Sequence, residues 1–233
     1  MPARLSVYDD SAFKKEVLTR FGAFRDDVGV LQKQYNIAPT IHIPIYTNTK
    51  VYTYAHFGLI PSWAKDRSAM QVNARSESVF EKSSFKEAYK QRRCLIPING
   101  YYEWVKDATH KKSQAYYIHA STQAYFACAG IYESWYDNTL KLTILSCALL
   151  TTEPNHTIAT IHDRMPVILE PDDWALWLDE KSNYAELNTL YTPLSSEKIA
   201  YYPVGDIVSS VKHDNETCIK EVTLVAPKQT TLF

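Results

Sequence analysis

Short runs of alternating apolar and polar residues are the feature that most constrains the fold of this chain. The sequence holds 17 Tyr and 5 Trp, and most of them lie in such runs, as is typical of half-buried strands. Residues 41–46 and 51–57 flank a Thr-Asn-Thr-Lys turn and predict a β-hairpin. Pro44 places its first strand at an edge or a bulge. Further strands are predicted at residues 94–98, 101–105, 115–120, 125–131, 141–146, 167–169 and 217–224.

Helices are predicted at fewer places. Asp10 or Ser11 can cap a helix that runs to Gly22, with an apolar face formed by Phe13, Val17, Leu18 and Phe21. Pro171 and the two acids after it suit the first turn of another helix, whose apolar face is Trp174, Trp177 and Leu178. The spacing of a capping box predicts a helix over residues 78–89, and a short helix is expected within residues 151–160.

Length and composition favour a single folded domain. A chain of 233 residues can form one core before it divides, and 45% hydrophobic with 22% charged residues is far from the composition of disorder. No repeat, linker or low-complexity tract divides the chain. We therefore expect one α+β domain over residues 1–233, mainly antiparallel β with a few peripheral helices. The 25 basic and 26 acidic residues mean that binding to nucleic acid would need a local basic patch.

The cysteine and histidine residues predict no metal site and no cofactor. Cys94, Cys128, Cys147 and Cys218 are widely spaced without a C-x-x-C motif, and each lies in an apolar, strand-like setting. They are therefore interpreted as inert core residues rather than nucleophiles. No apolar stretch reaches the length of a membrane span, and the N-terminus does not have the pattern of a signal peptide. The expected location is the cytoplasm, with no membrane and no obligate protein partner.

Polar residues embedded in apolar segments are the most informative for function, since their burial costs free energy unless a partner compensates for it. Five such places occur: Arg4, Tyr35-Asn-Ile-Ala-Pro39, Val72-Asn-Ala-Arg-Ser-Glu77, Ile98-Asn-Gly-Tyr-Tyr-Glu-Trp104 and Ile161-His-Asp-Arg-Met-Pro166. In this order they resemble the SOS-response-associated peptidase (SRAP) family, whose members combine an N-terminal Met-Cys-Gly-Arg with YN-x-AP, NAR-x-E, a G-[FWY]-[FY]-EW strand and a late H-x-R-MP. Residues 57–63 also resemble its WG-x-x-P-x-W element. The resemblance implies a barrel-like SRAP fold.

The resemblance further implies a guard of abasic sites in single-stranded DNA. In the family, the N-terminal cysteine condenses through its amine and thiol with the ring-opened aldehyde of an abasic deoxyribose. By position, Asn73 would hold the reacting N-terminus or sugar, Glu103 would move protons, and His162 would assist ring opening and the Schiff-base steps. The chemistry agrees, because imine formation needs an unprotonated amine and an acid that helps to expel water.

The same resemblance predicts the contacts to DNA. An arginine can bind phosphates in a forked geometry, and an exposed tryptophan or proline edge can stack on bases. The predicted DNA-binding residues are Arg4, Pro39, Trp63, Arg75, Trp104 and Lys212.

Structural explanations for these residues stay open at this point. Glu103 could be a solvent-facing strand residue, and His162 could belong to a hydrogen-bonded cluster with its neighbours. Asn73 and Arg75 could join two strands, and the tryptophans could belong to the core.

Pro2 departs from the family pattern. Met-Pro-Ala-Arg aligns with Met-Cys-Gly-Arg without a gap, so the thiol is missing and a thiazolidine product cannot form. With Met1 removed, the secondary amine of Pro2 could still form an iminium ion and promote β-elimination; with Met1 present, its nitrogen is an amide. Three explanations remain, namely a natural paralogue without covalent chemistry, a lineage that uses its terminal amine as a lyase, or a sequence altered in cloning.

Two functions from different classes are therefore predicted. The first is a DNA-damage protein that reacts with abasic sites through Asn73, Glu103 and His162. The alternative is a non-covalent binder of single-stranded DNA that has lost crosslinking and self-peptidase activity. In this family, peptidase action best fits self-removal of Met1, which the missing cysteine should disable.

Overall fold

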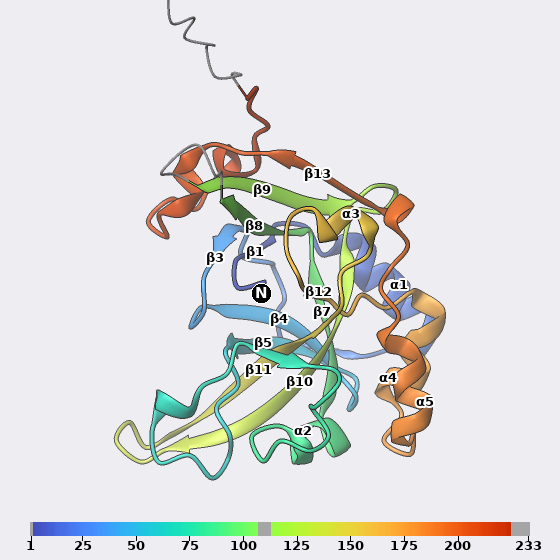
Figure 1. Ribbon diagram of the computed structural model, residues 1–233. Helices are drawn as coiled ribbons and strands as arrows, with labels where there is room; N and C mark the ends of the chain where they lie inside the picture. Colours follow the sequence, from blue (N-terminus) through green and yellow to red (C-terminus); the bar gives the residue numbers. More distant parts are fainter. Residues whose placement is uncertain (1, 107–112, 225–233) are drawn as a thin grey trace, which may run out of the picture.

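A computed structural model of the chain describes residues 2–106 and 113–224 (Figure 1). Its strands are β1 (Leu5–Val7), β2 (Arg25–Asp26), β3 (Gln34–Ile37), β4 (His42–Thr47), β5 (Val51–Phe57), β6 (Asn73–Arg75), β7 (Arg93–Ile98), β8 (Gly100–Lys106), β9 (Ser113–Ala120), β10 (Phe126–Asp137), β11 (Leu142–Thr152), β12 (Met165–Pro166) and β13 (Ile199–Pro203). Its α-helices are α1 (Ser11–Phe21), α2 (Lys86–Gln91), α3 (His156–Ala159), α4 (Trp174–Leu178) and α5 (Tyr184–Asn188). Short 3-10 helices are η1 (Arg67–Ala69), η2 (Pro171–Asp173), η3 (Thr189–Tyr191), η4 (Ser196–Lys198), η5 (Asp206–Ser209) and η6 (Glu216–Ile219).

The larger sheet closes into a barrel. Its strands follow the order β12-β11-β10-β7-β4-β5-β2, and β11 also pairs in parallel with β5. This pairing joins Ser146 to His56 and Cys147 to Phe57, so that β5, β4, β7, β10 and β11 form a closed ring. Beyond this contact β11 pairs with β6, again in parallel. The prediction of an α+β, mainly antiparallel and barrel-like fold is confirmed.

A second sheet of five strands lies against the barrel, in the order β13-β9-β8-β1-β3. Figure 1 shows β8, β9 and β13 on one side of the molecule and β4, β5, β10 and β11 on the other. The first strand of the chain, β1, is an inner strand between β8 and β3. The residues that precede β1 therefore enter the molecule between the two sheets.

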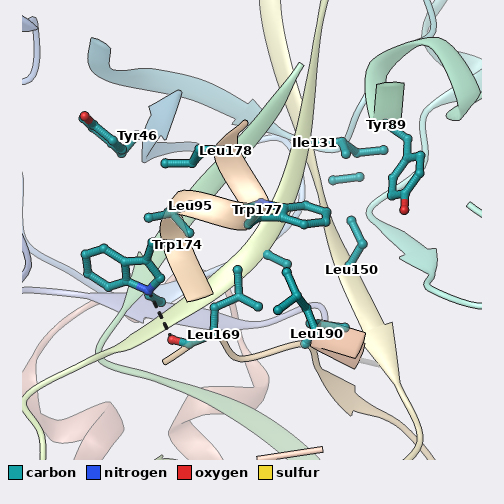
Figure 2. Packing of buried hydrophobic residues seen from close by; sticks show 14 of the residues in the cluster. Tyr46, Tyr89, Leu95, Ile131, Leu150, Leu169, Trp174, Trp177, Leu178 and Leu190 are labelled. Atoms are coloured by element: carbon teal, nitrogen blue, oxygen red, sulfur yellow. Dashed lines mark hydrogen bonds between the residues drawn. The ribbon is translucent and has the colours of Figure 1, made fainter. Parts of the chain in front are cut away.

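Apolar residues fill both faces of the barrel wall. Cys94 and Ile96 of β7 belong to the interior cluster, whereas Leu95 faces the cluster formed with the helices. Figure 2 shows Trp174 and Trp177 of α4 packed in this outer cluster. Their indole N–H groups donate to backbone oxygens of Leu169 and Cys94, at 3.2 and 2.9 Å. The burial of both faces explains why all residues of β7 are buried.

Most of the predicted strands are present, with different lengths. The hairpin of β4 and β5 is confirmed, but β4 is an inner strand that also pairs with β7. Pro44 is accommodated because the pairing with β7 involves only Tyr46 and Thr47. β10 and β11 are longer than predicted, so the start of the helix predicted at residues 151–160 is strand, and only His156–Ala159 is α-helix.

Four other local predictions were wrong. The strand predicted at residues 167–169 is absent, and only Ile168 forms an isolated bridge, to Cys128. Residues 217–224 do not form a strand; they begin within η6, where the Asn215 side chain accepts from Thr217 N at 3.0 Å and caps a helical turn. The helix predicted over residues 78–89 is reduced to α2, and turns precede it. α1 begins as predicted, but the Asp10 carboxylate accepts from the Tyr52 hydroxyl at 3.0 Å instead of capping the helix.

No helix in the described parts of the chain is both long enough and apolar enough to span a membrane.

Candidate functional site

The N-terminal segment is placed by the pairing of β1 with β8. Leu5 pairs with Tyr101, and the Arg4 carbonyl accepts from Tyr102 N at 2.9 Å. Continuing this antiparallel register brings residues 2 and 3 beside residues 103 and 104. Pro2 is buried. Its carbonyl accepts from the Asn73 side-chain amide, Nδ2, at 2.9 Å.

Asn73 is fixed by the barrel. It begins β6 and pairs with Leu149 of β11, so its backbone belongs to the barrel wall. Its Nδ2 binds Pro2, whereas its Oδ1 is buried and has no hydrogen-bond partner among the described residues. Since a buried amide oxygen without a partner is costly, this acceptor is suited to a hydroxyl or amine group brought by a ligand.

Glu103 lies on the face of β8 that is turned toward the barrel. It is only 5% exposed, and this burial raises the pKa of its carboxyl, although the nearby His162 opposes the shift. Its Oε2 lies 4.0 Å from His162 Nε2. The interpretation of Glu103 as a solvent-facing strand residue is therefore wrong, and the raised pKa favours a group that can donate a proton.

His162 follows α3 and brings its ring to Glu103 from another part of the chain. Its Nδ1 lies 2.9 Å from the backbone N of Arg164 and 2.9 Å from Asp163 Oδ1. Neutral Nδ1 can accept the Arg164 N–H, which leaves the proton on Nε2, facing Glu103. Protonated Nδ1 can instead donate to Asp163, whose side chain is 84% exposed. The ring can thus be held in both protonation states.

Arg164 and Glu77 lock two of the sequence motifs together. Arg164 donates to both carboxylate oxygens of Glu77, at 2.6 and 2.9 Å, and to the Thr151 carbonyl at 2.6 Å. Burial would raise the pKa of Glu77, but the hydrogen bonds from Arg164 bring it below its usual value. The clamp joins the end of β6 to the segment that carries His162. Sequence reasoning placed both residues in motifs without assigning them a role.

Arg4 and Trp104 lie on the other face of β8. The Arg4 guanidinium lies 5.6 Å from the centre of the Trp104 ring and donates to Asn36 Oδ1 and, at 2.7 Å, to the Val208 carbonyl. Trp104 is partly exposed, and its Nε1 lies 3.4 Å from Ser209 Oγ. Arg4 thus has structural partners within the protein, in addition to any role in DNA binding.

Asn36 anchors the loop that carries Lys212. Its Nδ2 donates to the carbonyls of Val208, Ser210 and His213, at 3.1, 3.1 and 2.7 Å. The Lys212 side chain is exposed on this loop. The YN-x-AP motif therefore has a structural function here, which is to attach a loop from the C-terminal part of the chain to β3.

The other predicted DNA-binding residues lie nearer to the solvent. Arg75 is exposed at the end of β6, two residues beyond Asn73. Trp63 is 59% exposed and donates through Nε1 to the Ser83 carbonyl at 3.2 Å, so it is not a core aromatic. Pro39 is partly buried in the loop after β3. Among the predicted catalytic residues, the structure therefore joins Pro2 to Asn73 and places Glu103 beside His162, while the pairing of β1 with β8 brings the N-terminal segment next to Glu103. Arg75 is two residues from Asn73.

The four cysteines are buried, and none of them forms a disulfide bond. Burial raises the pKa of the Cys94, Cys128 and Cys147 thiols. Together these features suit core residues better than a replacement for the missing N-terminal thiol. In the described parts of the chain, no three side chains of His, Cys, Asp or Glu are grouped so that they could hold a metal ion.

Comparisons with known proteins agree with the motif pattern. The abasic site processing protein YoaM of Bacillus subtilis is 35% identical over 193 residues, which cover 80% of this chain and 84% of that protein. The abasic site processing protein HMCES of Xenopus tropicalis is 29% identical over 237 residues, covering 84% and 68% of the two chains.

The fold is shared with a solved protein from Bacteroides thetaiotaomicron. The two have a TM-score of 0.82 and 26% sequence identity over 94% of this chain and 99% of that chain. The family described as SOS response associated peptidase (SRAP) matches residues 1–211. This chain therefore belongs to the SRAP family.

Proposed function

We propose that this protein recognises abasic sites in DNA, in single-stranded form, as part of the response to DNA damage. The observation that carries the proposal is that Asn73 holds the buried Pro2, while β8 places Glu103 beside the N-terminal segment and 4.0 Å from His162. The names of the relatives from Bacillus subtilis and Xenopus tropicalis, both abasic site processing proteins, support the same role.

An abasic nucleotide suits this site because it lacks a base. The buried Asn73 Oδ1 has no hydrogen-bond partner among the described residues, and it could accept from a hydroxyl group of the sugar. Glu103 on β8 and His162 after α3 lie with Oε2 and Nε2 4.0 Å apart. This distance suits an acid and a base that act on one sugar. An intact nucleotide would bring a base for which these residues offer no stacking surface.

The flanking nucleotides would contact residues around this site. Arg75 is exposed and next to β6, where it can bind a phosphate, while Trp63 and Trp104 offer rings for stacking. Pro39 and Lys212 would extend this surface, and Arg4 would support it through its contact with Trp104. Because the chain has a net charge of −1, binding would depend on these local groups.

Fluorescence anisotropy with labelled oligonucleotides tests the proposal. The protein should bind single-stranded DNA with one abasic site more tightly than the same strand with an intact base or its duplex. Arg75→Ala should weaken binding and reduce the slope of log K against log salt by about 1. Arg25→Ala is the matched control, since Arg25 is exposed on β2 and pairs with Asp27. Equal affinity for abasic and intact strands would refute the proposal.

A non-covalent binder remains the alternative function. It is favoured by the absence of a thiol at position 2 and by the burial of the four cysteines. It predicts the same binding preference, without any covalent intermediate.

A further inference from the structure

We infer that the form of this protein that begins at Pro2 is a turnover abasic-site lyase, in which the proline secondary amine forms an iminium ion with the sugar aldehyde. The inference rests on the proposed function, because the site must first bind abasic DNA. It goes beyond that function because it assigns a strand-cleaving reaction, and a nucleophile, to this particular chain.

The position of Pro2 is the first support. Its carbonyl is held by Asn73, and the pairing of β1 with β8 fixes the residues that follow it. The nitrogen of Pro2 belongs to a rigid ring on this anchored residue, so its position varies less than that of a flexible side chain. Once residue 1 is removed, the nitrogen becomes an amine. An α-amine has a pKa of about 7.7–8.0 in model peptides, so part of it is unprotonated near neutral pH.

The chemistry of a secondary amine is the second support. Its nitrogen attacks C1′ of the ring-opened sugar, the N–C1′ bond forms, and the carbonyl oxygen leaves as water after taking up protons. The nitrogen loses its only hydrogen, so the iminium ion keeps its positive charge at any pH. A permanent charge next to C2′ makes the protons on this carbon more acidic.

Elimination then follows without any oxidant or cofactor. A base takes a proton from C2′, its electron pair moves toward C3′, and the C3′–O bond breaks so that the phosphate leaves with its electrons. Water adds to C1′ of the conjugated iminium ion, which releases an unsaturated aldehyde and restores the amine. The strand is cut on the 3′ side of the abasic site, and the protein is ready to react again.

Glu103 and His162 provide the proton transfers for these steps. The pairing of β1 with β8 places Glu103 beside the N-terminal segment, and burial raises the pKa of its carboxyl, so this group is suited to donate a proton as water leaves. His162 can be neutral, since its Nδ1 accepts from Arg164 N, and can carry a proton, since Asp163 lies 2.9 Å from the same nitrogen. It is therefore suited to take the proton from C2′ and to release it afterwards.

The absence of an accessible thiol is the third support. In a chain with a terminal cysteine, sulfur would close a ring on the iminium carbon and stop the reaction there. Here position 2 has no sulfur, and Cys94, Cys128, Cys147 and Cys218 are all buried. The iminium ion consequently has elimination and hydrolysis as its outlets.

The test compares two forms of the whole chain whose first residue is verified by intact mass. One begins at Pro2 after treatment with a methionine aminopeptidase, and the other keeps Met1. Each is incubated with an end-labelled single strand containing one abasic site, once with the protein in excess and once with the DNA in excess, with and without cyanoborohydride. Cleavage is followed on a gel, the trapped adduct by mass and peptide mapping, and binding by anisotropy in the same samples.

The expected result is specific to the first form. It should give 3′ cleavage, a trapped adduct on the Pro2 nitrogen and more than one cut strand per protein when DNA is in excess. Glu103→Gln should slow cleavage by about 100-fold with little change in affinity. Glu133→Gln is the control and should leave the cleavage rate unchanged. Glu133 is a buried carboxyl on β10 that forms an ion pair with Arg92 at 2.7 Å. Pro2→Cys should instead give a heat-stable crosslink.

Two results would overturn the inference. One is tight, abasic-specific binding by the Pro2 form without cleavage or adduct, which would leave the proposed function intact and favour the non-covalent binder. The other is equal cleavage by the form that keeps Met1, since the nitrogen of Pro2 is then an amide. Loss of abasic-specific binding itself would instead refute the proposed function.

Discussion

Arg164→Ala tests whether the clamp between two motifs holds the site together. The Arg164 side chain is 10% exposed and makes two hydrogen bonds to Glu77 and one to the Thr151 carbonyl. Glu77 is 49% exposed, so its ion pair contributes only about 0.2–1 kcal/mol. The buried Thr151 carbonyl would keep the Ser76 N–H at 2.9 Å but lose a charged donor, at a cost of about 1.5–3 kcal/mol. Together the change should lower the free energy of unfolding by about 2–4 kcal/mol.

Urea denaturation, followed by fluorescence and circular dichroism, measures this loss. Glu77→Gln keeps the shape and leaves the Arg164 contact with Thr151, so it should cost less than about 1 kcal/mol. The two variants together should show coupling, because their side chains share hydrogen bonds. A loss of less than about 0.5 kcal/mol for Arg164→Ala, within the usual range for surface changes, would refute the clamp. So would an equal loss for Glu77→Gln.

Three further predictions concern stability. Burial raises the pKa of Glu103 in the folded protein above its usual 4.5. The contribution of Glu103 to the stability of the fold is therefore most favourable at low pH, and it is lost as the pH rises through the folded pKa. Glu103→Gln should therefore unfold at higher urea than the unmodified chain at pH 8, with a smaller difference at pH 4, and an unchanged difference would contradict this. Trp177→Ala should cost about 3–5 kcal/mol, since Trp177 is fully buried in the outer cluster; calorimetry showing a normal melting temperature would argue against it. Gly100→Ala should reduce the yield of folded protein, because its Cβ would lie 2.4 Å from the Tyr117 ring and 2.6 Å from the Ile118 carbonyl; full stability in the same urea assay would exclude this clash.

Strand identity was predictable where the pattern repeated over several residues. The hairpin of β4 and β5 and the strands β7, β8 and β9 follow the alternation of apolar and aromatic residues. Short strands escaped detection, since β1, β3 and β6 have three or four residues each. Their strand conformation depends on hydrogen bonds to distant partners, such as that of β6 to β11.

The local errors had similar causes. Residues 217–224 contain strand-forming residues, but the Asn215 cap and the contacts of this segment with β3 favour a helical turn. The capping-box spacing at residues 78–81 did not decide the start of a helix. In both places, a local preference was outweighed by contacts that one stretch of sequence does not show.

For the candidate site too, the sequence decided some properties and the tertiary structure decided others. The sequence by itself identified Asn73, Glu103 and His162 as candidates for the chemistry, and it determined that position 2 carries no thiol. Only the tertiary structure decided that Glu103 is buried with a raised pKa, that His162 meets it at 4.0 Å, and that Asn73 holds Pro2. The physical reason is that these properties depend on desolvation and on distances between strands far apart in the chain.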